Sequence, residues 1–181
     1  MGNKVKEKNE KYVIIVGEMK SGTTSLYKYM CNHPKICPCQ EKEPEFFSAN
    51  RKNKLSIEKY EYLWDFQPEH HKYRIEASTG YTKFPFERGV PQRINKYDIN
   101  PKFIYIVRNP IERIESQFNF ENRIKGVRVD NFRAKRLVEV SKYFQQLDRF
   151  RSVFPKRDRY LVLDFEELKS DTSTLLERCA D

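Results

Sequence analysis

The sequence predicts an α/β protein with three layers, in which helices cover both faces of a central, mainly parallel sheet. Short apolar runs at residues 12–16, 74–77, 103–107 and 160–163 alternate with segments of helical length, a pattern typical of parallel sheets. A glycine-containing turn also leads from the first run into a helical segment. A chain of 181 residues can bury one core, so we expect a single domain over residues 1–181.

The first expected strand, residues 12–16, ends at a loop with the spacing of a phosphate-binding loop. Gly17 and Gly22 stand as in the G-x-x-x-x-G-K-[ST] loop that holds a nucleoside triphosphate. Thr23 occupies the lysine position of that motif, and the lysine is instead Lys20. Backbone N–H groups at such a strand–turn–helix junction bind phosphate. We therefore expect a P-loop-like site that lacks the usual arrangement for a magnesium-bound triphosphate.

Two segments have helical periodicity. Residues 23–32 follow the loop and place Leu26, Tyr29 and Met30 on one face. Residues 132–154 predict one long amphipathic helix that ends before a proline. The side chains spaced along its apolar face are Leu137, Val140, Phe144, Leu147, Arg151 and Phe154.

The expected strand at residues 103–107 is followed by a second polar junction. Arg108 ends the apolar run, and Asn109 is placed to cap the helix that follows, with Glu112 at the capping-box position. A planar guanidinium group suits a phosphate. Ligands of parallel sheets bind at the carboxyl ends of the strands, so Lys20 and Arg108 are expected to share one cleft.

These segments together resemble a known enzyme family. Residues 20–26, Lys-Ser-Gly-Thr-Thr-Ser-Leu, resemble the 5′-phosphosulfate loop of the sulfotransferases, which use 3′-phosphoadenosine-5′-phosphosulfate (PAPS) as sulfuryl donor. Residues 42–47 resemble the segment in which a glutamate three residues before a Phe-Phe pair is the catalytic base, as in the carbohydrate (heparan-sulfate-type) branch. Residues 103–116 resemble the 3′-phosphate segment. The likeness runs from about residue 11 to residue 177.

The resemblance implies an in-line sulfuryl transfer from PAPS to a hydroxyl or amine acceptor, with a carbohydrate as the leading acceptor class. It implies two catalytic residues: Lys20, which stabilises the leaving group, and Glu43, which removes the acceptor proton. It implies PAPS as co-substrate and no metal. The residues implied to bind PAPS are Lys20, Ser21, Gly22, Thr23, Thr24, Ser25, Arg108 and Ser116.

The sequence departs from the family pattern at two places. Residues 76–81 resemble an element near the family's cleft, but Ala77 replaces its lysine, and Ser78 either lines the site or belongs to a simple turn. Family members usually continue past residue 181 with a basic, glycine-containing loop, so the sequence resembles a short member or a fragment. The surroundings of His70 and His71 do not match the branch that uses a histidine base.

Three other functions remain open. The chain could be a P-loop nucleotide kinase-like protein, or a non-catalytic module that binds PAPS or its product 3′,5′-adenosine bisphosphate (PAP). The formal charge of +9, from 35 Lys and Arg against 26 Asp and Glu, would also suit nucleic acid. Since the sequence contains no recognisable nucleic-acid-binding module, we expect no nucleic-acid partner. The sequence makes no statement about oligomeric state.

The N-terminal residues and the spacing of the cysteines give expectations about cellular location and metal binding. Residues 1–10 are polar and lysine-rich, and we expect them to form a disordered tail that is not a signal peptide. The sequence contains no apolar stretch long enough for a membrane span. We expect a cytoplasmic protein without a membrane partner, or alternatively the trimmed lumenal domain of a membrane-anchored enzyme. The spacing of Cys31, His33, Cys37 and Cys39 does not match common structural zinc sites.

Overall fold

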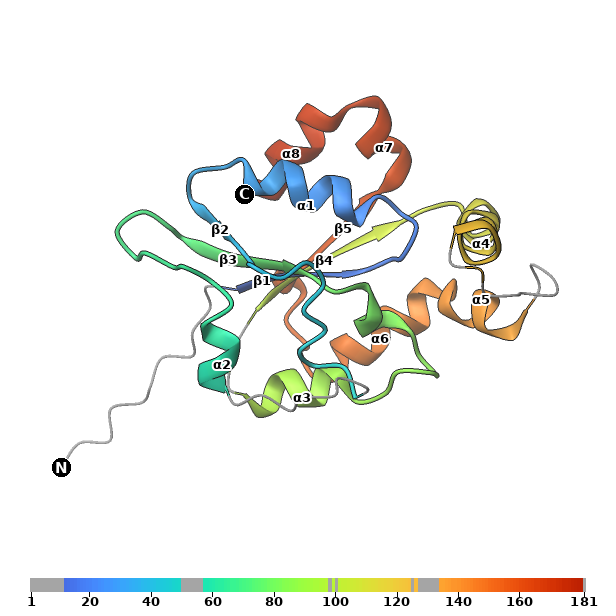
Figure 1. Ribbon diagram of the computed structural model, residues 1–181, viewed down its shortest axis with the longest axis horizontal. Coiled ribbons are helices and arrows are strands. Elements are labelled where there is room, and N and C mark those ends of the chain that lie inside the picture. The colour runs from blue at the N-terminus through green and yellow to red at the C-terminus, as the bar shows by residue number, and fades with distance from the viewer. Residues whose placement is uncertain are drawn as a thin grey trace.

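The structure, a computed structural model, describes residues 12–49, 57–97, 99, 101–124, 126 and 134–180. Its centre is a parallel sheet in the order β2-β3-β1-β4-β5 (Figure 1), which confirms the predicted fold class. The expected tail, residues 1–10, lies outside the described residues. The strands are β1 (Tyr12–Gly17), β2 (Ile36–Pro38), β3 (Tyr73–Ala77), β4 (Lys102–Val107) and β5 (Tyr160–Asp164).

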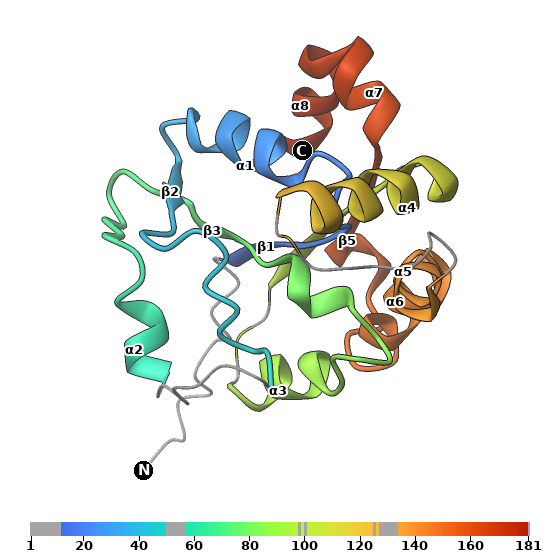
Figure 2. The ribbon, with the colours of Figure 1, turned by 45° about the vertical axis from the view of Figure 1, so that its right-hand side comes forward.

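Helices cover both faces of the sheet, as Figures 1 and 2 show. One face carries α1 (Thr23–Cys31), α7 (Phe165–Ser170) and α8 (Thr172–Ala180). The other face carries α2 (Ile57–Glu61), α3 (Val90–Lys96) and α6 (Tyr143–Arg151). Near the carboxyl ends of the strands lie α4 (Pro110–Asn119) and α5 (Lys135–Val140). Shorter turns are two 3₁₀ segments, Thr79–Thr82 and Arg157–Arg159, and a π-helical turn, Phe120–Ile124.

The central strand β1 is buried along its whole length. Tyr12, Ile14 and Val16 belong to the core under α2, α3 and α6, whereas Val13 and Ile15 belong to the core under α1, α7 and α8. Successive side chains of a strand point to opposite faces, so a strand that is covered on both sides reads as a continuous apolar run. This explains why residues 12–16 are recognisable from sequence.

Strand β2 was not predicted. It has only three residues and ends at Pro38, so it offers no apolar run long enough to read as a strand. It pairs in parallel with β3, with Cys37 opposite Arg74. This parallel pairing gives β2 the same direction as its neighbours. Residues 39–49, which follow β2, therefore lie at the same end of the sheet as the loop after β1.

The prediction of one helix over residues 132–154 is wrong. The described part of this segment forms α5 and α6, separated at Ser141 and Lys142, and residues 132–133 lie outside the described part. The carbonyl oxygen of Leu137 accepts hydrogen bonds from Arg113 Nη2 at 2.6 Å and from Ser141 Oγ at 2.9 Å. These side-chain contacts cap α5. Phe144, expected on the apolar face, is 73% exposed.

Helix α1 packs on the sheet through Leu26, which is fully buried, whereas Tyr29, expected on the same face, is 44% exposed. We predict that Leu26→Ala lowers the free energy of unfolding by about 2–5 kcal/mol, because it leaves a cavity between α1 and the sheet. Tyr29→Ala is the matched control on the same helix and should change it by about 0.5 kcal/mol or less. Urea unfolding measures both. Equal losses would contradict the packing of α1.

Candidate functional site

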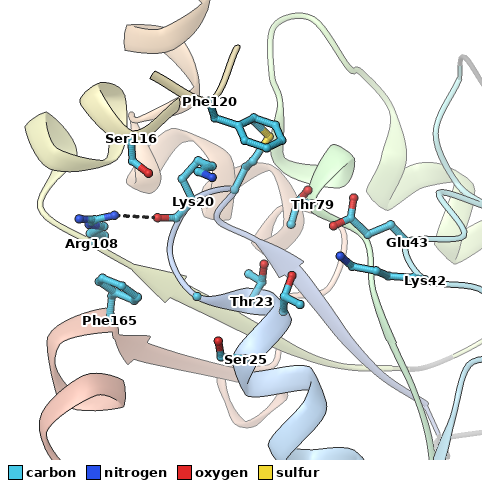
Figure 3. Close-up of a pocket in the computed structure, with 13 residues that line it drawn as sticks. Lys20, Thr23, Ser25, Lys42, Glu43, Thr79, Arg108, Ser116, Phe120 and Phe165 are labelled. Carbon is cyan, nitrogen blue, oxygen red and sulfur yellow. Dashed lines mark hydrogen bonds between the residues drawn. The ribbon is translucent and has the colours of Figure 1, made fainter. Parts of the chain in front are cut away.

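A cavity of about 630 Å³ opens at the edge where the carboxyl ends of the strands meet. Figure 3 shows the side chains that line it, which come from loops and helices far apart in the sequence. The cavity is lined by Met19, Lys20, Gly22, Thr23, Thr24, Ser25, Lys42, Glu43, Thr79, Arg108, Ser116, Phe120 and Phe165.

The cavity brings together all but one of the residues that were predicted from the sequence to be catalytic or to bind PAPS. Lys20, Gly22, Thr23, Thr24, Ser25, Glu43, Arg108 and Ser116 all line it. Ser21 does not, because its side chain is fully buried and its backbone N–H donates to the carbonyl oxygen of Glu18 at 3.1 Å. Among the backbone groups proposed for phosphate, the N–H of Ser21 is therefore already engaged within the loop.

The phosphate loop presents the N-terminus of α1 to the cavity. Gly22 precedes the helix with φ 81, in the left-handed region that favours glycine. A Cβ at this position would lie 2.9 Å from ring atoms of Phe165, so glycine is needed for space as well. The first N–H groups of a helix have no partner within it. Those of Thr23, Thr24 and Ser25 thus lie at the cavity wall, an arrangement whose partial positive charge suits an anion.

Lys20 and Arg108 supply positive charge on one side of the cavity. Lys20 has the left-handed φ of 70, uncommon for a residue with a side chain, and its Nζ lies 4.2 Å from the ring centroid of Phe120. Arg108 Nη1 donates to the carbonyl oxygen of Lys20 at 3.2 Å. Arg108 also pairs with Glu112 at 3.1 Å and stacks over Phe165 at 4.6 Å. These contacts leave the guanidinium group at the cavity wall beside Ser116 (Figure 3).

Glu43 lies on the opposite side of the cavity, with its carboxylate facing the region of Thr79 (Figure 3). Glu43 is exposed and has a left-handed φ of 51. Glu45, two residues later, points elsewhere. Its carboxylate accepts a hydrogen bond from the backbone N–H of Gly80 at 2.7 Å and another from Ser48 Oγ. Glu43 is therefore the glutamate of this loop that reaches the cavity.

Buried Glu76 lies beneath this loop. The sequence places it in the element of residues 76–81 that resembles part of the family's cleft, but gives Glu76 itself no role. Its carboxylate accepts hydrogen bonds from the hydroxyls of Tyr60 and Ser78, both at 2.6 Å, and from Tyr81 at 3.3 Å. Burial raises the pKa of Glu76 to about 7, and the hydroxyl donors partly oppose that rise. A buried carboxyl needs such partners because leaving it unsatisfied is costly.

The same hydroxyls fix the backbone of residues 45–47. Ser78 Oγ accepts from the N–H of Glu45 at 3.1 Å, and the Tyr81 hydroxyl accepts from the N–H of Phe47 at 3.2 Å. Glu76 therefore orients two side chains that hold the segment directly after Glu43. Ser78 is fully buried and does not line the cavity, whereas its neighbour Thr79 does.

A second buried polar cluster supports the phosphate loop. Glu18 accepts from the N–H of Met19 at 2.8 Å and from the hydroxyl of Tyr105 at 3.0 Å. Arg113, also fully buried, lies 3.8 Å from Glu18 and donates to Ser141 Oγ at 2.8 Å. Burial raises the pKa of Glu18 to about 7, although Arg113 acts in the opposite direction. Nothing local in the sequence marks this pair, because Glu18 lies in the loop after β1 whereas Arg113 belongs to α4, far along the chain.

The N-cap predicted after β4 is confirmed at Asn109. The Glu112 carboxylate, which the sequence places at the capping-box position, accepts hydrogen bonds from Arg108 instead. Asn109 Oδ1 accepts from the backbone N–H groups of Ile111 and Glu112 at the start of α4. This cap fixes the direction of α4, so Ser116 faces the cavity while Arg113 points into the interior. His70 and His71 precede β3, at the opposite edge of the sheet from the cavity.

Comparison with known proteins agrees with this geometry. A model of the family described as the sulfotransferase domain matches residues 10–181. The chain belongs to this family. A membrane-associated sulfotransferase of Dictyostelium discoideum, kil1, is 33% identical over 112 residues, which are 59% of this chain and 22% of that protein. The chain therefore spans about a fifth of the length of that curated relative.

Solved structures show the same fold. The crystal structure of a sulfotransferase from Alicyclobacillus acidocaldarius has a TM-score of 0.76 and 27% identity, covering 94% of this chain and 79% of that one. A mouse sulfotransferase crystallised with PAP has a TM-score of 0.55 and 20% identity, covering 96% of this chain and 57% of that one. The second likeness concerns the fold alone.

Among the described ranges, which begin at residue 12 and have gaps, no group of three or more His, Cys, Asp or Glu side chains is placed to hold a metal ion. Cys31, Cys37, Cys39 and Cys179 are free thiols. No helix within the same ranges has the length and apolar character needed to cross a membrane.

The raised pKa values of Glu76 and Glu18 predict how the stability of the fold depends on pH. Between about pH 4.5 and pH 7 the folded state keeps the Glu76 proton while the unfolded state loses it. We predict that the free energy of unfolding falls as pH rises through this window, by up to about 1.4 kcal/mol per pH unit for each such group. Glu76→Gln removes one group and should flatten the slope.

Urea unfolding at several pH values measures this slope. Glu18 contributes in the same direction, so the slope should shrink in Glu76→Gln without vanishing. Glu115→Gln, which changes an exposed glutamate of α4, is the control and should keep the wild-type slope. An unchanged slope in Glu76→Gln would show that Glu76 is ionised in the folded state throughout the window.

Proposed function

We propose that this chain is a PAPS-dependent sulfotransferase that moves the sulfuryl group of PAPS to a hydroxyl or amine acceptor. One observation carries the proposal. A single cavity is lined by the N-terminus of α1, by Arg108 and Ser116, and by the carboxylate of Glu43. Two anion sites and one base in the same space match a donor with two phosphates and an acceptor that must lose a proton. Membership of the sulfotransferase family supports the same reaction.

The arrangement supports one orientation of PAPS. The 5′-phosphosulfate would lie at the first turn of α1, where backbone N–H groups and the hydroxyls of Thr23 and Thr24 face the cavity. The 3′-phosphate would contact Arg108 and Ser116, which lie on the side away from Glu43 (Figure 3). Arg108 would then exchange its exposed pairing with Glu112, a contact of the kind that contributes little to stability.

The proposed chemistry is an in-line displacement at sulfur. The acceptor oxygen or nitrogen forms a bond to sulfur as the bond from sulfur to the 5′-phosphate oxygen breaks. Lys20 would stabilise the negative charge that develops on that leaving oxygen, leaving PAP. Glu43 would take the proton that the acceptor loses. The left-handed backbone at both residues is consistent with this assignment, because uncommon backbone conformations cluster at functional sites.

The proposed acceptor class is a carbohydrate. Its support is the likeness of residues 42–47 to the carbohydrate branch, together with the position of Glu43 on the exposed side of the cavity. A kinase-like function is the alternative. It would require the triphosphate-binding lysine of the G-K-[ST] motif, and Thr23 occupies that position in the structure as in the sequence. Preference for ATP–Mg over PAP in direct titration would favour the kinase.

Binding of PAP is the first test. At a concentration one hundred times its dissociation constant, PAP should stabilise the folded protein by about 2.7 kcal/mol. We predict a clear rise in the melting temperature of the wild type and a much smaller rise in Arg108→Ala. Arg157→Ala removes an exposed arginine before β5, away from the cavity, and should behave as the wild type. A wild-type melt unchanged by millimolar PAP would contradict the proposal.

The second test separates the roles of Glu43 and Lys20, using labelled PAPS and a panel of glycans. Glu43→Gln should reduce turnover by about 10²–10⁴-fold, the range of general-base catalysis, with PAP affinity nearly unchanged. Lys20→Ala should also reduce turnover far more than PAP affinity, because its partner charge develops in the transition state. Glu41→Gln, an exposed change in the same loop, is the control.

Two results would overturn the role of Glu43. Most activity retained in Glu43→Gln would place the base elsewhere. Loss of PAP binding in the same variant would show that Glu43 supports the structure of the nucleotide site and does not act on the acceptor.

A further inference from the structure

Lys42 is a charged side chain of the cavity that has no part in the steps described above. It lines the main cavity and also a small second one of about 10 Å³, whose other walls are Thr23, Thr24, Tyr27, Glu43 and Ala77. Figure 3 shows its amino group beside the Glu43 carboxylate and directed toward the first turn of α1. Lys42 is exposed and makes no hydrogen bond or ion pair with any residue in the part of the chain that the structure describes.

The backbone that carries Lys42 is tied to its surroundings. The N–H of Cys39 donates to the carbonyl oxygen of Ile75 at 3.0 Å, and the N–H of Gln40 donates to that of Leu63 at 2.8 Å. The hydroxyl of Tyr27, on α1, donates to the carbonyl oxygen of Cys39 at 3.1 Å. These bonds fix the start of the loop against α1. Lys42 is therefore held at the phosphate-binding end of α1.

Ala77 contributes to the same arrangement. It ends β3 beside Lys42 and has no side-chain atom beyond Cβ. No longer side chain from the end of β3 therefore fills the space between α1 and Glu43, and Lys42 reaches that space from the neighbouring loop. The result is a cation on the acceptor side of the cavity, whereas Lys20 approaches from the phosphate loop (Figure 3).

The proposed reaction creates a need for a cation at this place. The transferred sulfuryl group carries negative oxygens, and Glu43 would bring a second negative charge close to them. Like charges at short distance repel one another, and a cation between them offsets the repulsion. We propose, resting on the proposed function, that Lys42 is a second catalytic cation that contacts the sulfuryl oxygens of bound PAPS. Lys42 keeps its proton throughout, and the bonds formed and broken at sulfur are those of the displacement already described.

The difference between PAPS and PAP tests this role without an identified acceptor. PAPS has the sulfuryl group and PAP lacks it, so a contact to that group affects only PAPS affinity. In Lys42→Met, the dissociation constant of PAPS should rise by about 10- to 100-fold, the scale of one hydrogen bond to a charged group. That of PAP should change by about twofold or less. Lys28→Met, an exposed change on α1, should alter neither.

Two further measurements complete the test. Lys42→Arg keeps the charge and should retain most of the PAPS affinity that Lys42→Met loses. Turnover of labelled PAPS at saturation should be lower in Lys42→Met than in the wild type, because the same contact persists as the sulfuryl group moves.

Two other outcomes would overturn the inference, and a third would refute the proposed function. Equal weakening of PAPS and PAP in Lys42→Met would make Lys42 a phosphate contact and overturn the inference. Unchanged affinity for both would show that Lys42 does not touch the donor, which also overturns it. A wild-type protein that binds neither nucleotide would instead refute the proposed function itself, so the two failures are distinguishable.

Discussion

The parallel register of the sheet around β1 is the constraint on which the cavity depends. Pairing of β1 with β3 on one side and β4 on the other brings the carboxyl ends of these strands to one edge. The same register continues outward to β2 and β5. The segment that follows each strand then contributes one wall of the cavity. In strand order β1, β2, β3, β4 and β5, the residues are Lys20, Glu43, Thr79, Arg108 and Phe165.

Two buried carboxyl groups hold the loops that reach this edge. Glu76 supports the loop of Glu43 through Ser78 and Tyr81, and Glu18 lies within the phosphate loop beside Arg113. Burial of such groups opposes folding, and their hydrogen bonds only partly offset that cost. Their retention beneath the candidate site is consistent with a rigid framework, because a loop held by buried hydrogen bonds presents its side chains in one geometry.

The charges of the cavity are distributed in a way that suits an elongated ligand with an anionic group toward each end. Arg108 lies at one end, the N-terminus of α1 in the middle, and Lys42 with Glu43 at the other end (Figure 3). Lys20 lies between them. Family membership and this distribution agree on sulfuryl transfer as the proposed chemistry.

The fold class, the glycine-containing loop after β1 and the junction after β4 could be predicted from the sequence, because each depends on a local pattern. Continuous apolar runs mark strands that are covered on both faces, and Asn109 caps α4 through its nearest neighbours. The tertiary structure alone decided the short strand β2, the break between α5 and α6, and the buried pairing of Glu18 with Arg113. Each of these arises from contacts between segments far apart in the sequence, and such contacts leave no periodic or neighbouring-residue pattern by which the sequence could reveal them.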